Sequence, residues 1–223
     1  MKFENTHVYG ILDAIRGARN PLESWDKMDS YMDANHNTVI GPNDMKLLQN
    51  LLNASVKDRS NSHSKFLRQI MLSVDIEASL FWFKEFDTYK VGTTANSTST
   101  MHKLASTPIC LPCFETGDLQ NVDLGEDSLV NGTFTDNLVR MIGFLETLRL
   151  KYLETKDKRY WKELIRWLPE SWLQTRTVTA NYQVIRSMYF DRRNHKLTEW
   201  SESFVDWVKT LPYAEELIMF EGR

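Results

Sequence analysis

A period-two run in the first third of the chain constrains the fold most strongly. From Phe66 to Ile76 the even positions carry apolar side chains, with Arg68 as the exception, and polar residues stand between them: Gln69, Ser73 and Asp75. This alternation is typical of a β-strand with one buried face. The strand is expected to begin near His63 and end near Glu77, and the aromatic-rich segment from Ala78 to Tyr89 predicts a helix directly after it.

The C-terminal part of the chain shows a different period. Apolar side chains recur at helical spacing from Leu138 to Lys156, Tyr160 to Leu168, Asn181 to Arg192 and Glu199 to Lys209. A further helix is expected after Pro42, with Asn43 as its N-cap. A strand-rich part combined with a helical half predicts the α+β class.

Size and charge narrow the class of protein. The chain has 223 residues and a formal net charge of −3, which does not suit a protein that coats nucleic acid. No apolar run approaches the ~18 residues of a membrane span, and the N-terminus lacks the pattern of a signal peptide. We therefore expect a cytoplasmic protein with no membrane and no nucleic-acid polymer as partner.

We expect a single domain, residues 1–223. It would consist of an N-terminal part (1–62), a strand and helix with a following loop (63–103), a long loop or lid (104–135) and a helical half (136–223). Residues 93–100 are rich in Thr and Ser, which suits either an exposed loop or a loop that lines a phosphate or cofactor.

Three local patterns leave alternatives open. Cys110 and Cys113 form a C-x-x-C, but too few further ligands are present for zinc, so they are interpreted as loop cysteines. Asp33 to Asp44 resembles a calcium loop, yet lacks its Gly and closing Glu, so no metal site is expected. The run from Arg16 to Pro21 pairs two cations with a turn, which suits either an anion site or the basic end of a helix.

The C-terminal spacing R-W-L-P-(x11)-N-(x10)-R-(x4)-L-T-E-W carries a specific resemblance. Its fixed points are Pro169, Asn181 and Arg192. It resembles the flavin-dependent thymidylate synthase family, in which a Leu-Pro pair, an Asn and an Arg follow one another at these two intervals. The family's fold is a central antiparallel sheet with a helical C-terminal half, and this fold is implied here.

The family's second signature, R-H-R-x-x-S-x-N-E-x-S-x-R-Y, is matched only in part. Thr94, Asn96 and Ser99 stand at its first Ser, its Asn and its second Ser. Tyr89, Lys90 and Val91 replace the R-H-R triplet, or Thr88, Tyr89 and Lys90 do so with a one-residue gap. Lys and Thr do not reproduce the planar double hydrogen bond of an Arg.

The resemblance implies an FAD- and folate-dependent methylation of dUMP to dTMP. FAD would be the cofactor, methylenetetrahydrofolate and NADPH the co-substrates, and the assembly a homotetramer. Arg192 would face the pyrimidine as the catalytic residue. The carried-over cofactor-binding residues are Lys90, Asn96, Asn181 and Ser187, and the substrate-binding residues are Arg166, Ser99 and Arg192.

Two further hypotheses stand beside this one. The first is a related nucleotide-binding or pyrimidine-modifying protein that has lost the flavin chemistry, because the triplet is missing. The second is a non-catalytic oligomeric scaffold. A cluster of five arginines between residues 166 and 193, with only two acids among them, favours a mononucleotide over a polymer if these arginines converge.

Overall fold

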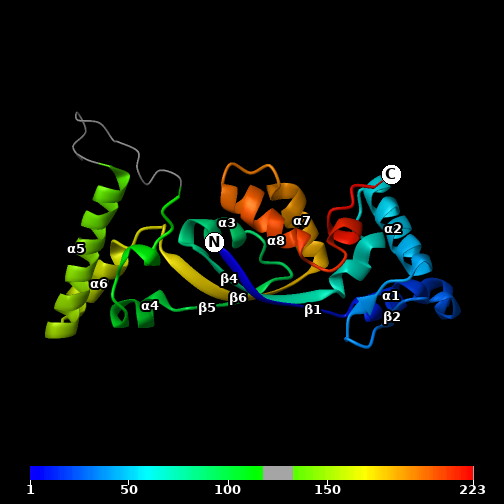
Figure 1. The fold of residues 1–223 in the computed structure, drawn as a ribbon, viewed down its shortest axis with the longest axis horizontal. Coiled ribbons are helices and arrows are strands. Elements are labelled where there is room, and N and C mark those ends of the chain that lie inside the picture. The colour runs from blue at the N-terminus through cyan, green and yellow to red at the C-terminus, as the bar shows by residue number, and fades with distance from the viewer. Residues whose placement is uncertain (118–132, 223) are drawn as a thin grey trace. The chain divides into compact units, whose positions relative to one another are not determined.

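The computed structural model describes residues 1–117 and 133–222. Its fold belongs to the predicted α+β class, with an antiparallel sheet. The main sheet has the strand order β1-β4-β6-β5, formed by β1 (Lys2–Tyr9), β4 (Met71–Ser79), β6 (Leu173–Asn181) and β5 (Thr94–Ser97) (Figure 1). A small antiparallel hairpin pairs β2 (Tyr31–Met32) with β3 (Thr38–Val39).

Each segment predicted to be helical contains a helix, and the structure adds two further helices, Ile11–Arg19 and Thr100–Lys103. The helices are α1 (Ile11–Arg19), α2 (Pro42–Lys57), α3 (Leu80–Phe86), α4 (Thr100–Lys103), α5 (Phe134–Thr155), α6 (Lys158–Arg166), α7 (Tyr182–Arg192) and α8 (Val205–Lys209). Short 3₁₀ helices are η1 (Asn20–Leu22), η2 (Trp25–Lys27), η3 (His63–Arg68), η4 (Leu104–Ser106) and η5 (Leu111–Cys113). Two π-helices, η6 (Glu199–Phe204) and η7 (Ala214–Ile218), lie near the C-terminus, and η6 continues directly into α8. Within the described ranges, no helix combines the length and apolar character that crossing a bilayer requires.

The residues group into two compact units. Unit 1 contains Met1, Glu77–Thr88 and Asn96–Arg176, and unit 2 contains Lys2–Ile76, Tyr89–Ala95 and the residues from Thr177 on. Because the boundaries fall inside β4, β5 and β6, the two units do not by themselves separate two domains. A single domain therefore stays a prediction.

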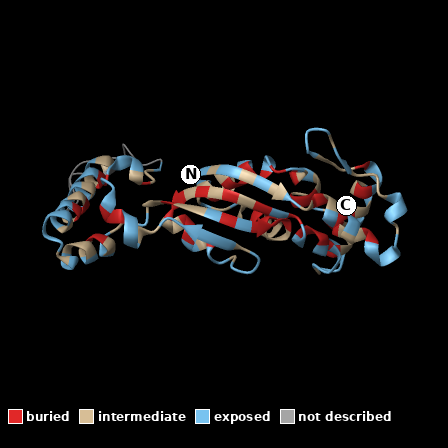
Figure 2. Cartoon of the chain, turned by 90° about the horizontal axis from the view of Figure 1, so that it is seen from below, coloured by how far each residue is buried: buried red, intermediate tan, exposed pale blue. Residues whose placement is uncertain are grey.

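Strand β4 confirms the period-two interpretation from Met71 onward. Its even-numbered residues from Leu72 to Ala78 are buried and the residues between them are partly exposed, as the alternating colours of Figure 2 show. In unit 2, α8 packs on β1, where the rings of Phe3 and Trp207 stack 4.6 Å apart. Trp207 Nε1 also donates to Thr6 Oγ1 at 3.1 Å, which ties the C-terminal helix to the first strand.

The expected strand between His63 and Ile70 is wrong. Residues 63–68 form the 3₁₀ turn η3, and the strand starts at Met71. The neighbouring side chains of Phe66 and Leu67 are both buried, which a strand with one buried face does not allow. Ile70 is buried as well, so the apolar even positions before Met71 belong to a turn and the residues after it, which pack into the core.

Of the strands in the described residues, only β4 was predicted; β5 lies in the segment 93–100 that was expected to be a loop, and β1 and β6 show why strands were missed. Strand β1 is mostly exposed, so its sequence carries only a weak alternation. Strand β6 has Thr at positions 175, 177 and 179, with the buried Val178 and Ala180 between and after them. This alternation of Thr with small apolar residues is a strand signal in the sequence, but it is short.

Unit 1 has its own small core beside α5 and α6. The buried members are Leu104, Ala105, Ile109, Phe114, Leu145 and Leu164. Helix α5 begins with a capping box in which Thr133 and Asp136 exchange hydrogen bonds. The predicted loop or lid from 104 to 135 thus contains η4, η5 and the start of α5, and its central residues 118–132 lie outside the described residues.

A reciprocal polar junction fixes the start of α2. Asn43 is not the N-cap as predicted: Gly41 is, and the carboxylate of Asp29 accepts from the amides of Asn43 and Asp44 at 2.9 and 3.0 Å. The carboxylate of Asp44 in turn accepts from the amides of Asp29 and Ser30. A Cβ at Gly41 would lie 2.3 Å from the Asp29 carboxyl carbon, so only glycine fits.

The carboxylate of Asp44 also neutralises a buried arginine, Arg19. Arg19 Nε donates to Asp44 Oδ1 at 2.6 Å, and the two side chains are 4% and 0% exposed. Burial alone would raise the pKa of Asp44, but hydrogen bonds from Ser30, Arg19 and the two amides hold it below its usual value. Asp44 is the last residue of the run that resembles a calcium loop, and its carboxylate oxygens are already bonded to these groups.

We predict that Asp44→Asn destabilises the protein by about 3 to 5 kcal/mol, because it leaves Arg19 buried and unpaired. The stability that Asp44 contributes is complete above the pKa of an unfolded Asp, about 3.9, and is lost as the pH falls through the lower folded-state pKa. Urea unfolding measured between pH 3 and pH 7 checks both statements.

The matched control is Asp26→Asn, since Asp26 is exposed on η2. Its free energy of unfolding is expected to change by less than about 0.5 kcal/mol. An equal effect of the two substitutions would contradict the role assigned to the buried pair.

Candidate functional site

Arg192 lies at the centre of an aromatic and acidic cluster in unit 2. Its Nε donates to the Tyr89 hydroxyl at 2.9 Å, and that hydroxyl donates to Asp191 Oδ2 at 3.2 Å. The guanidinium carbon lies 5.5 Å from the ring centre of Tyr89 and 5.3 Å from that of Trp200. These contacts hold the guanidinium between two rings, which an Arg accepts more readily than a Lys.

The local sequence explains how this cluster forms. Helix α7 ends at Arg192, and Trp200 belongs to η6 and is fully buried. Tyr89 follows α3 in the chain and occupies the place of the first residue of the triplet in the ungapped alignment. Burial raises the pKa of the Tyr89 phenol above its ordinary value, against the opposing effect of Arg192, so the phenol stays protonated and can donate to Asp191.

Asn181 is the N-cap of α7. Its side-chain oxygen accepts from the amide of Val184 at 3.0 Å, and the residue is 9% exposed. Gly92 approaches this helix start with φ = +86°, and a Cβ there would lie 2.9 Å from Val184 Cγ2. The loop after Tyr89 therefore needs glycine to pass the first turn of α7.

Two further candidates of unit 2 have plain surroundings. The Ser187 hydroxyl donates back to the carbonyl of Gln183 at 3.1 Å within α7. Lys90 is exposed, as is its neighbour Val91 at 91%. Neither position supplies the fork of an arginine.

The remaining three candidates lie in unit 1. Asn96 stands on the exposed strand β5. Ser99 caps α4 by accepting from the amide of His102 at 3.1 Å, and Arg166 forms an ion pair with Glu163 on α6. The structure thus places Lys90, Asn181, Ser187 and Arg192 in one unit and Asn96, Ser99 and Arg166 in the other.

The other arginines of the basic stretch are bound to different partners. Arg176 pairs with Asp87 at 2.8 Å and lies over the ring of Phe83. Arg186 Nη1 donates to the carbonyls of Leu217 and Ile218 at the end of η7, and Arg193 pairs with Glu221. These three arginines therefore pair with carboxylates or carbonyls of the chain itself.

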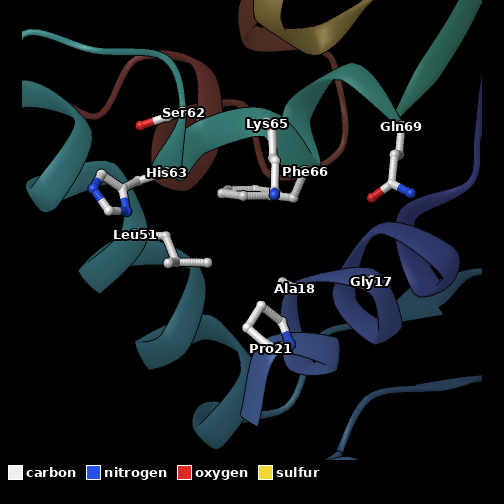
Figure 3. Close-up of a pocket in the computed structure, with 9 residues that line it drawn as sticks. All are labelled: Gly17, Ala18, Pro21, Leu51, Ser62, His63, Lys65, Phe66 and Gln69. Atoms are coloured by element: carbon white, nitrogen blue, oxygen red, sulfur yellow. The ribbon is translucent and has the colours of Figure 1, made fainter. Parts of the chain in front are cut away.

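A pocket of about 150 Å³ lies elsewhere in unit 2, between α1, α2 and η3 (Figure 3). Leu51 and Pro21 enter from one side, and Phe66, Lys65 and Gln69 approach from η3 and the residue after it. An adjoining hollow of about 490 Å³ adds Asn20 and Arg68. Apolar walls beside cationic and amide groups suit a small planar ring that carries a polar or anionic substituent.

No protein-family model and no curated protein matches the chain by sequence. Solved structures match it over almost its whole length. The flavin-dependent thymidylate synthase ThyX of Helicobacter pylori, in complex with FAD and dUMP, aligns with a TM-score of 0.67 at 18% identity, covering 97% of this chain and 98% of that one. A second structure of ThyX from that organism, at 2.31 Å resolution with FAD and dUMP, gives 0.65 at 18% identity over 98% and 97%.

A UMP/dUMP methylase, PolB of Streptomyces cacaoi bound to 5-Br dUMP, gives a TM-score of 0.62 at 14% identity over 98% and 93%. The chain has the flavin-dependent thymidylate synthase fold. The fold implied by the spacing around Asn181 and Arg192 is therefore confirmed, whereas identities this low carry no residue's role with them.

Within this thymidylate synthase fold, the sequence did not reveal the pocket. Its signal was present in part, because Gly17 and Pro21 belong to the run from Arg16 to Pro21 that was noted as a possible anion site. The two arginines of that run serve otherwise: Arg16 lies over Trp25 and Arg19 pairs with Asp44. They form the basic last turn of α1, which was the other interpretation.

We predict that Asn181→Ala destabilises the protein by about 1 kcal/mol, because the first turn of α7 loses its cap. Asn181→Asp keeps an acceptor oxygen and serves as the matched variant, with a stability close to that of the unsubstituted protein. Urea unfolding of both variants measures the difference. If Asn181→Ala unfolds at the same urea concentration as the unsubstituted protein, the capping role is contradicted.

Proposed function

We propose that this chain binds a pyrimidine nucleoside monophosphate such as dUMP. It would use the thymidylate synthase fold to take part in the modification of that pyrimidine. The near-complete fold match carries the proposal, because the neighbours are solved with dUMP or 5-Br dUMP. The position that matches the family's pyrimidine-facing arginine is retained as Arg192.

The surroundings of Arg192 support a binding role. Tyr89 accepts from Nε and the rings of Tyr89 and Trp200 flank the guanidinium. A guanidinium fixed in this way loses little rotamer entropy when it binds a phosphate or a uracil carbonyl. Positioning and electrostatic stabilisation of the pyrimidine are what such a group can contribute.

The pocket of Figure 3 does not include Arg192 and is a second candidate place for the planar ring. Phe66, Leu51 and Pro21 offer apolar contact to a base, and Gln69 offers the paired donor and acceptor that a pyrimidine edge recognises. Lys65 and Arg68, in the adjoining hollow, supply positive charge for a phosphate.

The residues carried over for FAD in unit 2 supply no arginine fork for that cofactor. Lys90 is exposed, the Asn181 oxygen caps α7, and the Ser187 hydroxyl is bonded within its own helix. Tyr89, at the start of the former triplet, binds Arg192 and Asp191. These groups offer no cationic fork to a pyrophosphate, so our first proposal includes no flavin step.

FAD- and folate-dependent methylation of dUMP to dTMP is the second candidate. It is favoured by the alignment of 97% of the chain with a structure that contains both FAD and dUMP. The homotetramer that the resemblance implies would help this candidate, since other copies of the chain could complete a flavin site. The homotetramer and the cytoplasmic location stay predictions.

We predict that Arg192→Ala and Arg192→Lys weaken dUMP binding by about tenfold to a hundredfold, the range of a lost charge-assisted hydrogen bond. Isothermal titration calorimetry with dUMP measures the affinities. Arg193→Ala is the matched control, because Arg193 pairs with Glu221 and should leave the affinity unchanged. Equal affinities for Arg192→Ala and the unsubstituted protein would remove Arg192 from the site.

Purified protein should be colourless, release no flavin on denaturation, and gain thermal stability from dUMP or UMP but not from FAD. Its visible absorption spectrum and a thermal-shift series measure these properties. A bound yellow flavin, together with complementation of a thymidine auxotroph, would replace our first proposal by the second candidate. No shift with any nucleotide or flavin would favour the oligomeric scaffold instead.

A further inference from the structure

Cys110 and Cys113 bring two thiols together on the short turn η5 of unit 1. Their sulfur atoms lie 3.6 Å apart, and both cysteines are free. Cys110 is exposed and Cys113 is partly exposed. The amide of Cys113 donates to the carbonyl of Cys110 at 2.9 Å, which closes the turn and keeps the two side chains on one side of it.

The chain before this turn is firmly anchored. Ile109 is buried, and its amide donates to Glu146 Oε2 on α5 at 2.9 Å. Arg149 holds that carboxylate with Nε at 2.7 Å and also donates to the carbonyl of Ala105. The N-terminal side of the cysteine turn is thus fixed to helix α5.

The chain after the turn is anchored as well. Phe114 is buried, forms an isolated antiparallel bridge with Trp172, and packs against its ring at 5.4 Å. The amide of Glu115 donates to the carbonyl of Ser171 at 2.7 Å. Two thiols held in contact between fixed ends need only side-chain rotation to approach the 2.05 Å of a disulfide bond.

The two thiols differ in their surroundings. Burial raises the pKa of the Cys113 thiol above its ordinary value, while Cys110 is open to solvent. An external reagent therefore reaches Cys110 first. A metal is a poorer explanation, because no group of three or more His, Cys, Asp or Glu side chains gathers anywhere in the part of the chain that the structure describes.

We propose that Cys110 and Cys113 form a dithiol–disulfide redox site that exchanges with a low-molecular-weight disulfide such as oxidised glutathione. The Cys110 thiolate attacks one sulfur of the external disulfide, forming a mixed disulfide and releasing one thiolate, which takes up a proton. Cys113 then loses its proton and attacks the Cys110 sulfur, releasing the second thiol. The chain loses two electrons and two protons, and one external disulfide becomes two thiols.

The site is independent of the proposed nucleotide function. It lies in unit 1 and shares no residue with the Arg192 cluster or the pocket of Figure 3. Because the fold holds the two thiols together, we expect the oxidised protein to be more stable than the reduced protein by about 1.4 kcal/mol, which corresponds to a tenfold easier oxidation of the folded chain, and to unfold at a slightly higher temperature. The consequence is a reversible chemical change at the surface of η5.

The test equilibrates the full-length, fully reduced protein with mixtures of reduced and oxidised glutathione and follows intact mass after acid quenching. We expect one species that is lighter by two hydrogen atoms and regains both thiols with dithiothreitol. Cys113→Ser should stop at one glutathione adduct on Cys110, since no second thiol can release it. Cys110→Ser should form an adduct more slowly, because Cys113 is less exposed.

A comparison with protein unfolded in urea tests whether the fold brings the thiols together. The folded chain should form the disulfide at an about tenfold lower ratio of oxidised to reduced glutathione than the unfolded chain. Equal ratios would contradict the role of the anchored turn. Two glutathione adducts on the unsubstituted protein, disulfide-linked dimers, or zinc retained against a chelator would each overturn the proposal.

Discussion

The buried pair between Arg19 and Asp44 is the interaction on which the N-terminal part of unit 2 depends. One carboxylate ends α1 by neutralising its last arginine and, through two amides, fixes the loop at Asp29 and Ser30. The carboxylate of Asp29 in turn accepts from two amides in the first turn of α2. Two helices and the loop between them are therefore aligned by a single hydrogen-bonded junction, and the pocket of Figure 3 lies between those same helices. The buried charge pair of Arg19 and Asp44 therefore helps to position α1 and α2, which line that pocket.

The sequence predicted those elements whose period or spacing is local. The alternation from Met71 and the helical spacing of α5 to α7 were sufficient to place a strand and three helices, and two gapless intervals around Asn181 and Arg192 implied the fold. The N-cap of α2 could not be predicted, because its acceptor is Asp29, fourteen residues away from Asn43. Strand β1 was missed because most of its residues are exposed, so pairing with β4, which no local pattern encodes, determines its conformation.

Polar groups at the candidate site already hydrogen-bond within the chain. Two polar groups that were expected to bind a cofactor make hydrogen bonds within their own chain, Asn181 as a cap and Ser187 within a helix, and Tyr89 at the triplet position bonds to Arg192. Hydrogen-bonding groups have a limited number of donors and acceptors, so a group used in this way has less to offer a ligand. Spacing alone could identify these positions but could not say whether their hydrogen bonds are already made.

The segments that form each unit determine when that unit can complete its fold during synthesis. Unit 1 is assembled largely from one continuous stretch, Asn96–Arg176, whereas unit 2 combines Lys2–Ile76 with residues from Thr177 on. Trp207 bonds to Thr6, and Tyr213 bonds to the backbone of Thr38 and Ile40. As a ribosome synthesises the chain from its N-terminus, β1 and α1 emerge long before these partners do. Apolar side chains of the N-terminal segment consequently stay without their final packing partners until the C-terminal helices have left the ribosome.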